Sequence, residues 1–368
     1  MPSGVRPDET LPPPLRLPRR ARRLLAGAYL LLVAGVAADV VTGPGTTVSP
    51  VLAAVPVLAG ATTRAARVPA LAGVVATLSV ILLALANRNV PLSVHITALV
   101  AVLAATLASA ANVILVSTRE RELFQVRTVS EAAQRALLRP PPEHVGRLRI
   151  AVRYAAAAAE ARIGGDLYDV VDTQQGLRIL LGDVQGSGLG AVETAADVLG
   201  VFREAARTEP DLTAVAGRLN AALARRPGQA GMSTRFVTAL LAGIPTGAGP
   251  VELVNCGHPH PLLLRAGRVS ELEPPEHAPP LSLLELLGGD YPASCFEPLP
   301  GDLLLLYTDG VSEARDSGGR FYPLAERLAA VGPHDPGDVL DELLGDVRAY
   351  ARAGLDDDAA LLAVRWEH

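Results

Sequence analysis

Apolar and polar residues are arranged differently in the two parts of the chain. Between residues 24 and 117, apolar residues form long runs that contain few charged residues. From about residue 147, they come in short groups bounded by Gly, Asp and Pro, or recur at helical spacing. Long uncharged runs are typical of helices that are apolar all round, whereas short runs between turn residues are typical of strands. The pattern predicts an all-helical N-terminal part and a mixed C-terminal part.

Four apolar segments make up the N-terminal part, at residues 24–41, 49–63, 69–87 and 93–117. About 20 apolar residues in a helix cross roughly 30 Å of hydrocarbon, and three of the segments are long enough. The second is short and contains Pro50 and Pro56. We expect residues 24–117 to be a membrane domain, an all-α bundle of about four transmembrane helices. A disordered, basic N-terminus at residues 1–23 precedes it.

Arginine residues predict how these segments are oriented. They precede the first segment, separate the second from the third and follow the fourth, at residues 16–23, Arg64, Arg67, Arg119 and Arg121. In the loops between segments, only Arg88 lies on the other side. Since basic loops favour the cytoplasmic side, we expect a multi-pass protein of the cell membrane with both ends in the cytoplasm. A signal peptide over residues 16–39 is the alternative, which the later apolar segments disfavour.

Residues 118–142 are predicted to form a linker helix, which the Pro140-Pro141-Pro142 run ends. The helix has an apolar stripe formed by Leu123, Val126, Ala133 and Leu137. Such a stripe either pairs with a second copy of the chain in a homodimer or packs on its own domain. Both interpretations stay open at the level of the sequence.

The C-terminal part, residues 143–368, is predicted to be an α+β domain. The expected strands are 148–154, 167–172, 177–183, 236–244, 251–255, 261–265, 302–308 and 359–366. The expected helices are 188–208, 211–225, 322–331 and 336–353. Strands and helices do not alternate as in a βαβ array, and the helices come in pairs. This order favours antiparallel sheets covered by helices. The Pro-rich residues 273–300 are expected to be a surface excursion.

The stretch 179–191, ILLGDVQGSGLGA, joins a short apolar run to an Ala-rich helical pattern through three alternating glycines. Asp183 thereby ends a strand beside a backbone that a ligand can approach closely. One interpretation is a metal-bound carboxylate in a phosphate-type site. Another is a dinucleotide fingerprint, G-x-G-x-x-A from Gly186 to Ala191, which needs a βαβ unit. The third is an aspartate in a Gly-rich turn.

Acidic residues recur at the ends of the predicted strands. They are Asp166, Asp183, Asp309 and the run Asp356-Asp357-Asp358. Each alone is typical of a turn, but if the sheets bring them together, they repel one another without a cation. Mg²⁺ and Mn²⁺ suit ligand sets of carboxylates and water, and two such ions activate a water and clamp a transferring phosphoryl group. The sequence has no His/Cys constellation for zinc.

Composition excludes some classes of function. The net charge of -5 gives no basic footprint for nucleic acid. The two cysteines, Cys256 and Cys295, make no disulfide framework. A reduced, cytosolic setting for the C-terminal part is therefore expected.

Five motifs occur in a fixed order: GGDLYDV, GDVQGSG, NCGHPHPLLL, LLLLYTDGVSEARD and DDDAALLAVR. Over about residues 145–366 this order resembles the SpoIIE-like branch of the PPM-type (type 2C) serine/threonine phosphatases. The whole layout resembles membrane-linked actinobacterial members of that branch. The resemblance implies an α-β-β-α sandwich of two antiparallel sheets and a binuclear Mn²⁺ or Mg²⁺ site. It also implies hydrolysis of phosphoserine or phosphothreonine in a protein by metal-activated water.

The resemblance assigns the central metal ligands. Asp183 matches the ligand shared by both ions, and the Val184 carbonyl lies beside it in the motif. Asp309 and Asp357 match the further ligands. Asp183, Asp309 and Asp357 are therefore the expected catalytic residues.

Three further residues are assigned less directly. Asp166 matches the acidic residue of the first motif and is expected to act through water or a third ion. Asp358 replaces Asp357 as a metal ligand if the last motif is shifted by one residue. Arg162 is the candidate to bind the substrate phosphate in a bidentate manner.

The sequence departs from the family pattern at Ser187, where the family often has histidine between two glycines. Serine has no pKa suited to a general acid for the leaving hydroxyl. A metal-bound water replaces that histidine, or turnover is slow, or another basic residue helps. His258 is the alternative general acid, although we favour a structural role for it.

We therefore expect a membrane-anchored, metal-dependent serine/threonine phosphatase with a cytoplasmic catalytic domain. The resemblance implies a phosphoprotein substrate such as an anti-sigma-factor antagonist, and a role in signal transduction. The rival hypothesis is a membrane receptor whose phosphatase-like domain has lost catalysis and acts as a binding module. Ser187 is the argument for the rival, and the complete set of aspartates is the argument against it.

Overall fold

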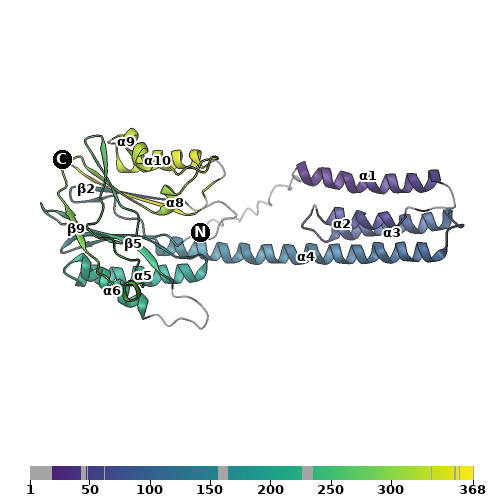
Figure 1. Cartoon of the computed structure of the whole chain (residues 1–368), viewed down its shortest axis with the longest axis horizontal. Helices are drawn as coiled ribbons and strands as arrows, with labels where there is room; N and C mark the ends of the chain where they lie inside the picture. The colour runs from purple at the N-terminus through teal and green to yellow at the C-terminus, as the bar shows by residue number, and fades with distance from the viewer. Residues whose placement is uncertain are drawn as a thin grey trace, which may run out of the picture. The chain divides into compact units, whose positions relative to one another are not determined.

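The computed structural model describes residues 19–42, 47, 49–61, 63–155, 165–225, 235–332, 334–351, 354–355 and 357–367 (Figure 1). The chain forms two compact units, Met1–Gln125 and Val126–His368. Arg162 and Asp356 lie outside the described residues, as do the side chains of Leu123 and Val126.

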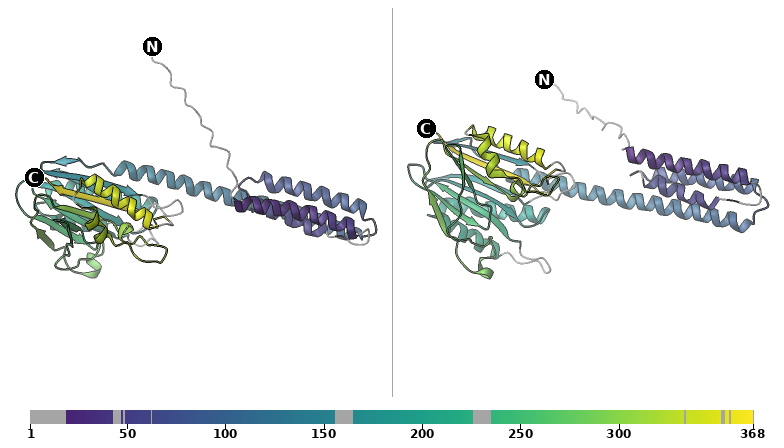
Figure 2. Two further views of the ribbon diagram at one scale, coloured as in Figure 1. Left: turned by 90° about the horizontal axis from the view of Figure 1, so that it is seen from above. Right: turned by 45° about the horizontal axis from the view of Figure 1, so that its top comes forward.

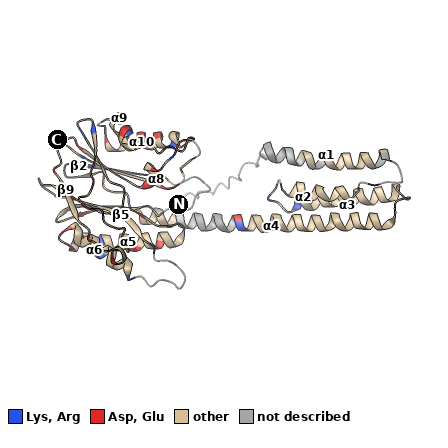
Figure 3. Cartoon of the chain, viewed as in Figure 1, with Lys and Arg blue, Asp and Glu red and all other residues tan. Residues whose placement is uncertain are grey.

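The N-terminal unit is helical. Its elements are α1 (Arg19–Thr42), η1 (Ser49–Ala53), α2 (Ala54–Gly60), α3 (Arg67–Ala86) and the first part of α4 (Leu92–Leu137). A small core packs Leu52 of η1 and Val80 of α3 against Val102 of α4. Where Figure 3 colours them, α2, α3 and the first part of α4 carry few charged residues.

Large apolar side chains of this unit point outward. Leu71, Leu82 and Leu107 have exposed fractions of 65%, 66% and 72%. Among the described residues, α3 and residues Leu92–Glu120 of α4 are long and apolar enough to cross a membrane. The apolar helix Ser49–Gly60 is shorter, as its two prolines predict.

The C-terminal unit contains two antiparallel sheets. The first has the strand order β1-β2-β11-β10-β7-β8 and the second β3-β4-β5-β6-β9. The strands of the first sheet are β1 (His144–Val145), β2 (Leu148–Ala155), β7 (Leu262–Arg265), β8 (Arg268–Glu271), β10 (Leu303–Tyr307) and β11 (Ala359–Trp366). Those of the second are β3 (Leu167–Thr173), β4 (Gly176–Val184), β5 (Val237–Ile244), β6 (Val251–Cys256) and β9 (Ala293–Phe296).

Helices cover the outer faces of both sheets (Figure 2). The second sheet is covered by α5 (Leu189–Thr208) and α6 (Leu212–Ala224), and the first by α9 (Leu324–Val331) and α10 (Pro336–Tyr350). Two short helices, α7 (Leu284–Leu287) and α8 (Asp309–Ser312), lie in the connections. The order of layers is therefore the predicted α-β-β-α sandwich.

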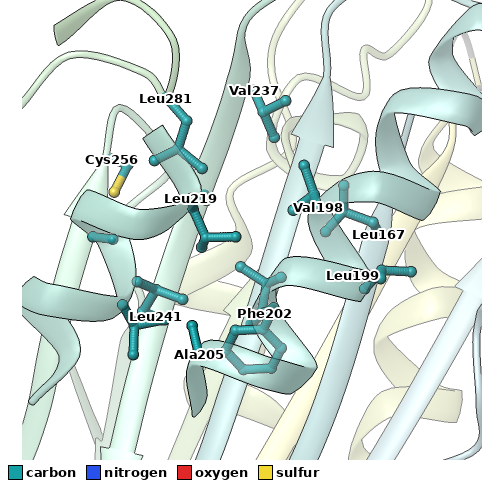
Figure 4. Close-up of a cluster of buried hydrophobic side chains, with 14 of the residues drawn as sticks. Leu167, Val198, Leu199, Phe202, Ala205, Leu219, Val237, Leu241, Cys256 and Leu281 are labelled. Atoms are coloured by element: carbon teal, nitrogen blue, oxygen red, sulfur yellow. The ribbon is translucent and has the colours of Figure 1, made fainter. Parts of the chain in front are cut away.

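Side chains alternate between the layers because successive residues of a strand face opposite sides of the sheet. On β4, Ile179 and Leu181 pack between the two sheets, whereas Leu180 packs under α5 and α6. There it joins a cluster that includes Phe202, Leu219 and Leu241 (Figure 4). Since both faces of each sheet are covered, the central strands read as continuous apolar runs.

Two sequence interpretations are decided by the topology. A dinucleotide fold is wrong, because β4 pairs antiparallel with β3 and β5 and forms no parallel βαβ unit. The expected excursion at residues 273–300 is partly structured, because β9 pairs with β6 through Val251 to Val254. β9 is an edge strand whose residues alternate between exposed and half-buried, so its sequence contains no clear apolar run.

Candidate metal centre

The expected carboxylates meet where the ends of both sheets come together. Asp166 precedes β3 and Asp183 lies near the end of β4, so both belong to the second sheet. The first sheet contributes Asp309, two residues after the end of β10, and Asp357 and Asp358, just before β11. These groups are close enough for their charges to interact. The charges of Asp183, Asp358 and Asp309 raise the pKa of Asp166. Those of Asp309, Asp357 and Asp358 raise the pKa of Asp183.

Two glycines allow the backbones at this site to approach closely. A Cβ atom on Gly165 would lie 2.7 Å from the Val184 nitrogen and 2.8 Å from Asp183 Oδ1. The Val184 N–H donates a 3.1 Å hydrogen bond to the Gly165 carbonyl, which fixes the first motif against the second. A Cβ atom on Gly310 would lie 2.8 Å from the carbonyl carbon of Asp358. A larger residue at either position would separate the carboxylates.

Three of the clustered carboxyl groups, those of Asp166, Asp183 and Asp309, have raised pKa values. Burial, followed by the charges of three neighbouring aspartates, raises the pKa of Asp183 to about 8. Burial and the charge of Asp183 raise the pKa of Asp166, and burial and the charge of Glu313 raise the pKa of Asp309. Carboxylates that lie close enough to repel one another form a set of oxygen donors suited to Mg²⁺ or Mn²⁺. The residues present therefore fit the expected metal ions.

The structure distinguishes the two neighbouring aspartates of the last motif. Asp357 is exposed and lines an open hollow of about 420 Å³ together with Asp309, Glu313 and Arg315. Asp358 is 4% exposed, and its carboxylate accepts a hydrogen bond from the Tyr154 hydroxyl. This arrangement favours Asp357 over Asp358 as the residue that faces a ligand.

Buried polar residues that sequence reasoning missed surround the carboxylates. Thr308 donates a 2.8 Å hydrogen bond from Oγ1 to Asp166 Oδ2, and the same oxygen accepts a 2.9 Å bond from the Ala360 N–H. Gln134 Nε2 donates to the Tyr154 hydroxyl over 3.0 Å and to the Asp166 carbonyl over 3.1 Å. Burial and the charge of Asp358 raise the pKa of Tyr154, which keeps its phenol protonated. None of these residues has a charge or a metal-ligand spacing that a sequence pattern would reveal.

The hydrogen bonds of His258 support the structural role that we favoured for it. Its Nε2 donates to the Tyr307 carbonyl over 3.1 Å, so its Nδ1 is the acceptor of a 3.0 Å bond from Thr238 Oγ1. Its backbone N–H and C=O are bonded to the Asn255 side chain. Burial lowers the pKa of His258 to about 3. A neutral imidazole with both nitrogens engaged is unsuited to protonate a leaving group.

An arginine that the sequence analysis did not single out covers the Gly-rich loop. Arg235 Nη1 donates a 2.8 Å hydrogen bond to the carbonyl of Gln185, two residues after Asp183. A Cβ atom on Gly190 would lie 3.1 Å from Arg235 Nη2, so the guanidinium lies along this loop. Arg235 thus places a cation beside the second motif.

The fold of the C-terminal unit is that of solved PP2C domains. The PP2C domain of SiaA from Pseudomonas aeruginosa has this fold, with a TM-score of 0.55 and 17% identity over 69% of this chain and 100% of that one. Residues 173–367, more than half of the chain, match the family model described as stage II sporulation protein E (SpoIIE). The chain belongs to this family.

Two other solved structures are similar. The phosphatase domain of SpoIIE from Bacillus subtilis, with a fragment of its regulatory domain, is 18% identical with a TM-score of 0.50, covering 59% of this chain and 63% of that one. The RsbU and RsbW domains of a Mycobacterium tuberculosis protein are 25% identical with a TM-score of 0.49, covering 60% of each chain. This chain thus spans about three-fifths of the length of these two structures.

Proposed function

We propose that this chain is a metal-dependent phosphatase that hydrolyses phosphoserine or phosphothreonine on a regulatory protein. The observation that carries the proposal is the meeting of five aspartates from two sheets, with a strongly raised pKa at Asp183. Membership of the SpoIIE family supports it. Carboxylates that are held together against their repulsion need a cation, and the reaction needs one as well.

Two Mn²⁺ or Mg²⁺ ions would be held by Asp183, Asp309 and Asp357, with the Val184 carbonyl beside them. Two other matching proteins, PstP and RsbX, have solved structures with manganese and magnesium, respectively. Ions of this kind activate a water molecule and neutralise charge on a transferring phosphoryl group. Here the donor set supports the proposal.

The residues of the chain would divide the remaining tasks. The hollow beside Asp309 and Asp357 gives a phosphorylated side chain access to the carboxylates. Asp166 and Asp358, which are buried, contribute negative charge from the protein side. Ser187 supplies no general acid, and both ring nitrogens of His258 are engaged. The leaving hydroxyl would therefore take its proton from water. Arg162, outside the described residues, stays a prediction as the phosphate-binding residue.

The location and the substrate class are also part of the proposal. We infer that the N-terminal unit anchors the protein in the cell membrane with the catalytic domain, residues 143–368, in the cytoplasm. The apolar helices α3 and α4 support a membrane anchor, and the arginine distribution supports the orientation. The resemblance of the five motifs to the SpoIIE-like branch is the ground for proposing a phosphorylated anti-sigma-factor antagonist as the substrate. The domain boundaries at 23, 117 and 142 and the homodimer stay predictions.

A catalytically inactive binding module is the second candidate, and Ser187 is the observation that favours it. The test is hydrolysis by the full chain in detergent, with and without Mn²⁺, of an aryl phosphate and of a phosphoserine peptide. We expect Mn²⁺-dependent release of phosphate from both. Asp309→Asn is the matched control, and it should abolish release. Tight Mn²⁺ binding without release from either substrate would favour the binding module instead.

A further inference from the structure

The last turns of α4 contact the carboxylate site through a buried side chain. Gln134 is 7% exposed, and both of its amide hydrogens are used: one bond reaches the Tyr154 hydroxyl and the other the backbone carbonyl of Asp166. Burying an amide is costly unless its hydrogen bonds are made. A buried glutamine that is bonded on both sides therefore fixes two segments of the protein relative to the helix.

Tyr154 extends this connection from Gln134 to the segment that precedes β11 in the first sheet. It lies on β2 opposite Ala360 of β11, two residues after Asp358. Its hydroxyl accepts the bond from Gln134 and donates its own proton to Asp358 Oδ2. The pairing of β2 with β11 sets where the phenol stands, and the phenol sets the direction of the Asp358 carboxylate.

The same turn of α4 is docked independently of Gln134. The Leu137 carbonyl accepts a 3.1 Å hydrogen bond from Arg203 Nη2, and Arg203 pairs with Asp169 of β3. Leu137 and Leu138 also pack against the core of the unit. The position of Gln134 relative to the carboxylates is therefore set by packing and does not depend on the amide alone.

We propose that Gln134 and Tyr154 are positioning residues, which hold Asp166 and Asp358 in the arrangement that accepts the metal ions. The proposal rests on the proposed phosphatase function. It adds the C-terminal turns of α4 to the metal centre: Gln134 holds the segment before β3 through a carbonyl, and Tyr154 holds the segment before β11 through a carboxylate. The two residues held in this way, Asp166 and Asp358, both interact electrostatically with Asp183.

A hydrogen bond with a purely structural role would contribute only to the stability of the fold. The test therefore compares the effect of each variant on metal affinity with its effect on stability. Hydrogen-bond partners of metal-site residues typically change metal affinity about 10- to 100-fold when they are removed. A structural hydrogen bond elsewhere changes the stability of the metal-free fold and leaves metal affinity unchanged. Tyr322 offers the matched control, because its hydroxyl donates a 2.7 Å bond to Asp346, which is not among the clustered carboxylates.

The experiment uses the full chain in detergent and four variants: Tyr154→Phe, Gln134→Leu, the double variant and Tyr322→Phe. Mn²⁺ affinity is measured by calorimetry, and the melting temperature is measured without metal. We expect Tyr154→Phe and Gln134→Leu each to weaken Mn²⁺ binding at least tenfold. Tyr322→Phe should leave Mn²⁺ binding unchanged, although its metal-free melting temperature should be similar to those of the other two variants. The double variant should weaken Mn²⁺ binding by less than the product of the two single effects, because the two residues share the bond from Gln134 to Tyr154.

Kinetics give a second readout. The turnover number at a fixed, subsaturating Mn²⁺ concentration should fall in both single variants, while the KM for a phosphoserine peptide stays that of the parent. Mn²⁺ affinities of Tyr154→Phe and Gln134→Leu equal to that of Tyr322→Phe would overturn the proposal and leave the phosphatase function standing. A parent chain that binds no Mn²⁺ would instead overturn the phosphatase function itself, and the positioning role with it.

Discussion

Thr308 and Asp166, which lie 142 residues apart in the sequence, are joined by a 2.8 Å hydrogen bond from Oγ1 to Oδ2 at the meeting of the two sheets. Thr308 follows β10 of the first sheet, and Asp166 precedes β3 of the second. The hydroxyl is fully buried and also accepts from the Ala360 N–H. One side chain thus joins three segments of the candidate metal centre.

Replacing Thr308 by valine keeps the shape and removes the hydroxyl. Two buried groups, the Asp166 carboxyl and the Ala360 N–H, then lose a partner. We expect Thr308→Val to lower the free energy of unfolding of the metal-free protein by about 1–3 kcal/mol. Thr308→Ser, which keeps the oxygen, should lose less. Urea unfolding of both variants measures the difference, and a Thr308→Val variant as stable as the parent would show that the hydroxyl bonds contribute nothing.

Asp183→Asn should abolish Mn²⁺-dependent hydrolysis without destabilising the metal-free fold. Asparagine is nearly isosteric, and it carries neither the proton nor the charge that the Asp183 carboxyl must hold among repelling neighbours. The metal-free variant should therefore melt at the parent's temperature or slightly above it. With Mn²⁺ at a hundredfold excess over its dissociation constant, the parent gains about 2.7 kcal/mol, and the variant should gain much less. Melting curves with and without Mn²⁺ test this. A metal-free variant that melts far below the parent would show that Asp183 is a structural turn residue.

The raised pKa of Asp183 predicts an unusual dependence of stability on pH. Below pH about 4 the carboxyl is protonated in both the folded and the unfolded chain. Between about 4 and about 8, the unfolded chain has released this proton and the metal-free folded chain still holds it. The contribution of Asp183 to metal-free stability therefore falls as the pH rises through this window. Unfolding at a series of pH values, compared with Asp183→Asn, isolates this contribution.

Mn²⁺ binding should release protons in the same pH window. A carboxylate must lose its proton to act as a ligand, and Asp183 holds one at pH 7 because its pKa is about 8. Calorimetry in buffers with different ionisation enthalpies counts the released protons directly. Asp183→Asn is the control, and it should release fewer. Binding without any proton release at pH 7 would contradict the raised pKa.

Ser187→His should raise the rate on phosphoserine-type substrates if a general acid is the missing element. The leaving alkoxide of such a substrate needs a proton, whereas the leaving group of an aryl phosphate does not. General acid catalysis typically contributes about 10²–10⁴ in rate. Parallel rate measurements on a phosphoserine peptide and an aryl phosphate test the idea. Equal changes on both substrates would exclude a general-acid role at this position.

The arginine distribution predicts the membrane topology. Reporter fusions after residues 45 and 90 should lie outside the cell, and fusions after residues 66 and 140 should lie inside. An outside position for residue 140 would contradict the cytoplasmic catalytic domain. It would exclude a cytoplasmic phosphoprotein as the substrate as well.

The sequence by itself determined the elements and the chemistry. Apolar runs such as Leu303–Leu306 predict buried strands because both faces of each sheet are covered, and β10 occupies this run. Helical spacing predicts α5 and α6 because their apolar stripes face one core. The motifs placed Asp166, Asp183 and Asp309 at strand ends, where the structure has them. These features are local, so a pattern of neighbouring residues is sufficient to reveal them.

Only the tertiary structure decided which groups surround those carboxylates. Asp357 and Asp358 are adjacent and chemically identical, and the pairing of β2 with β11 turns one toward Tyr154 and leaves the other at the hollow. Gln134 and Thr308 join the site through contacts across 32 and 142 residues of sequence. Their uncharged side chains carry no periodicity and no ligand spacing. Their roles follow from the closure of two sheets on each other, which brings distant segments into one buried place.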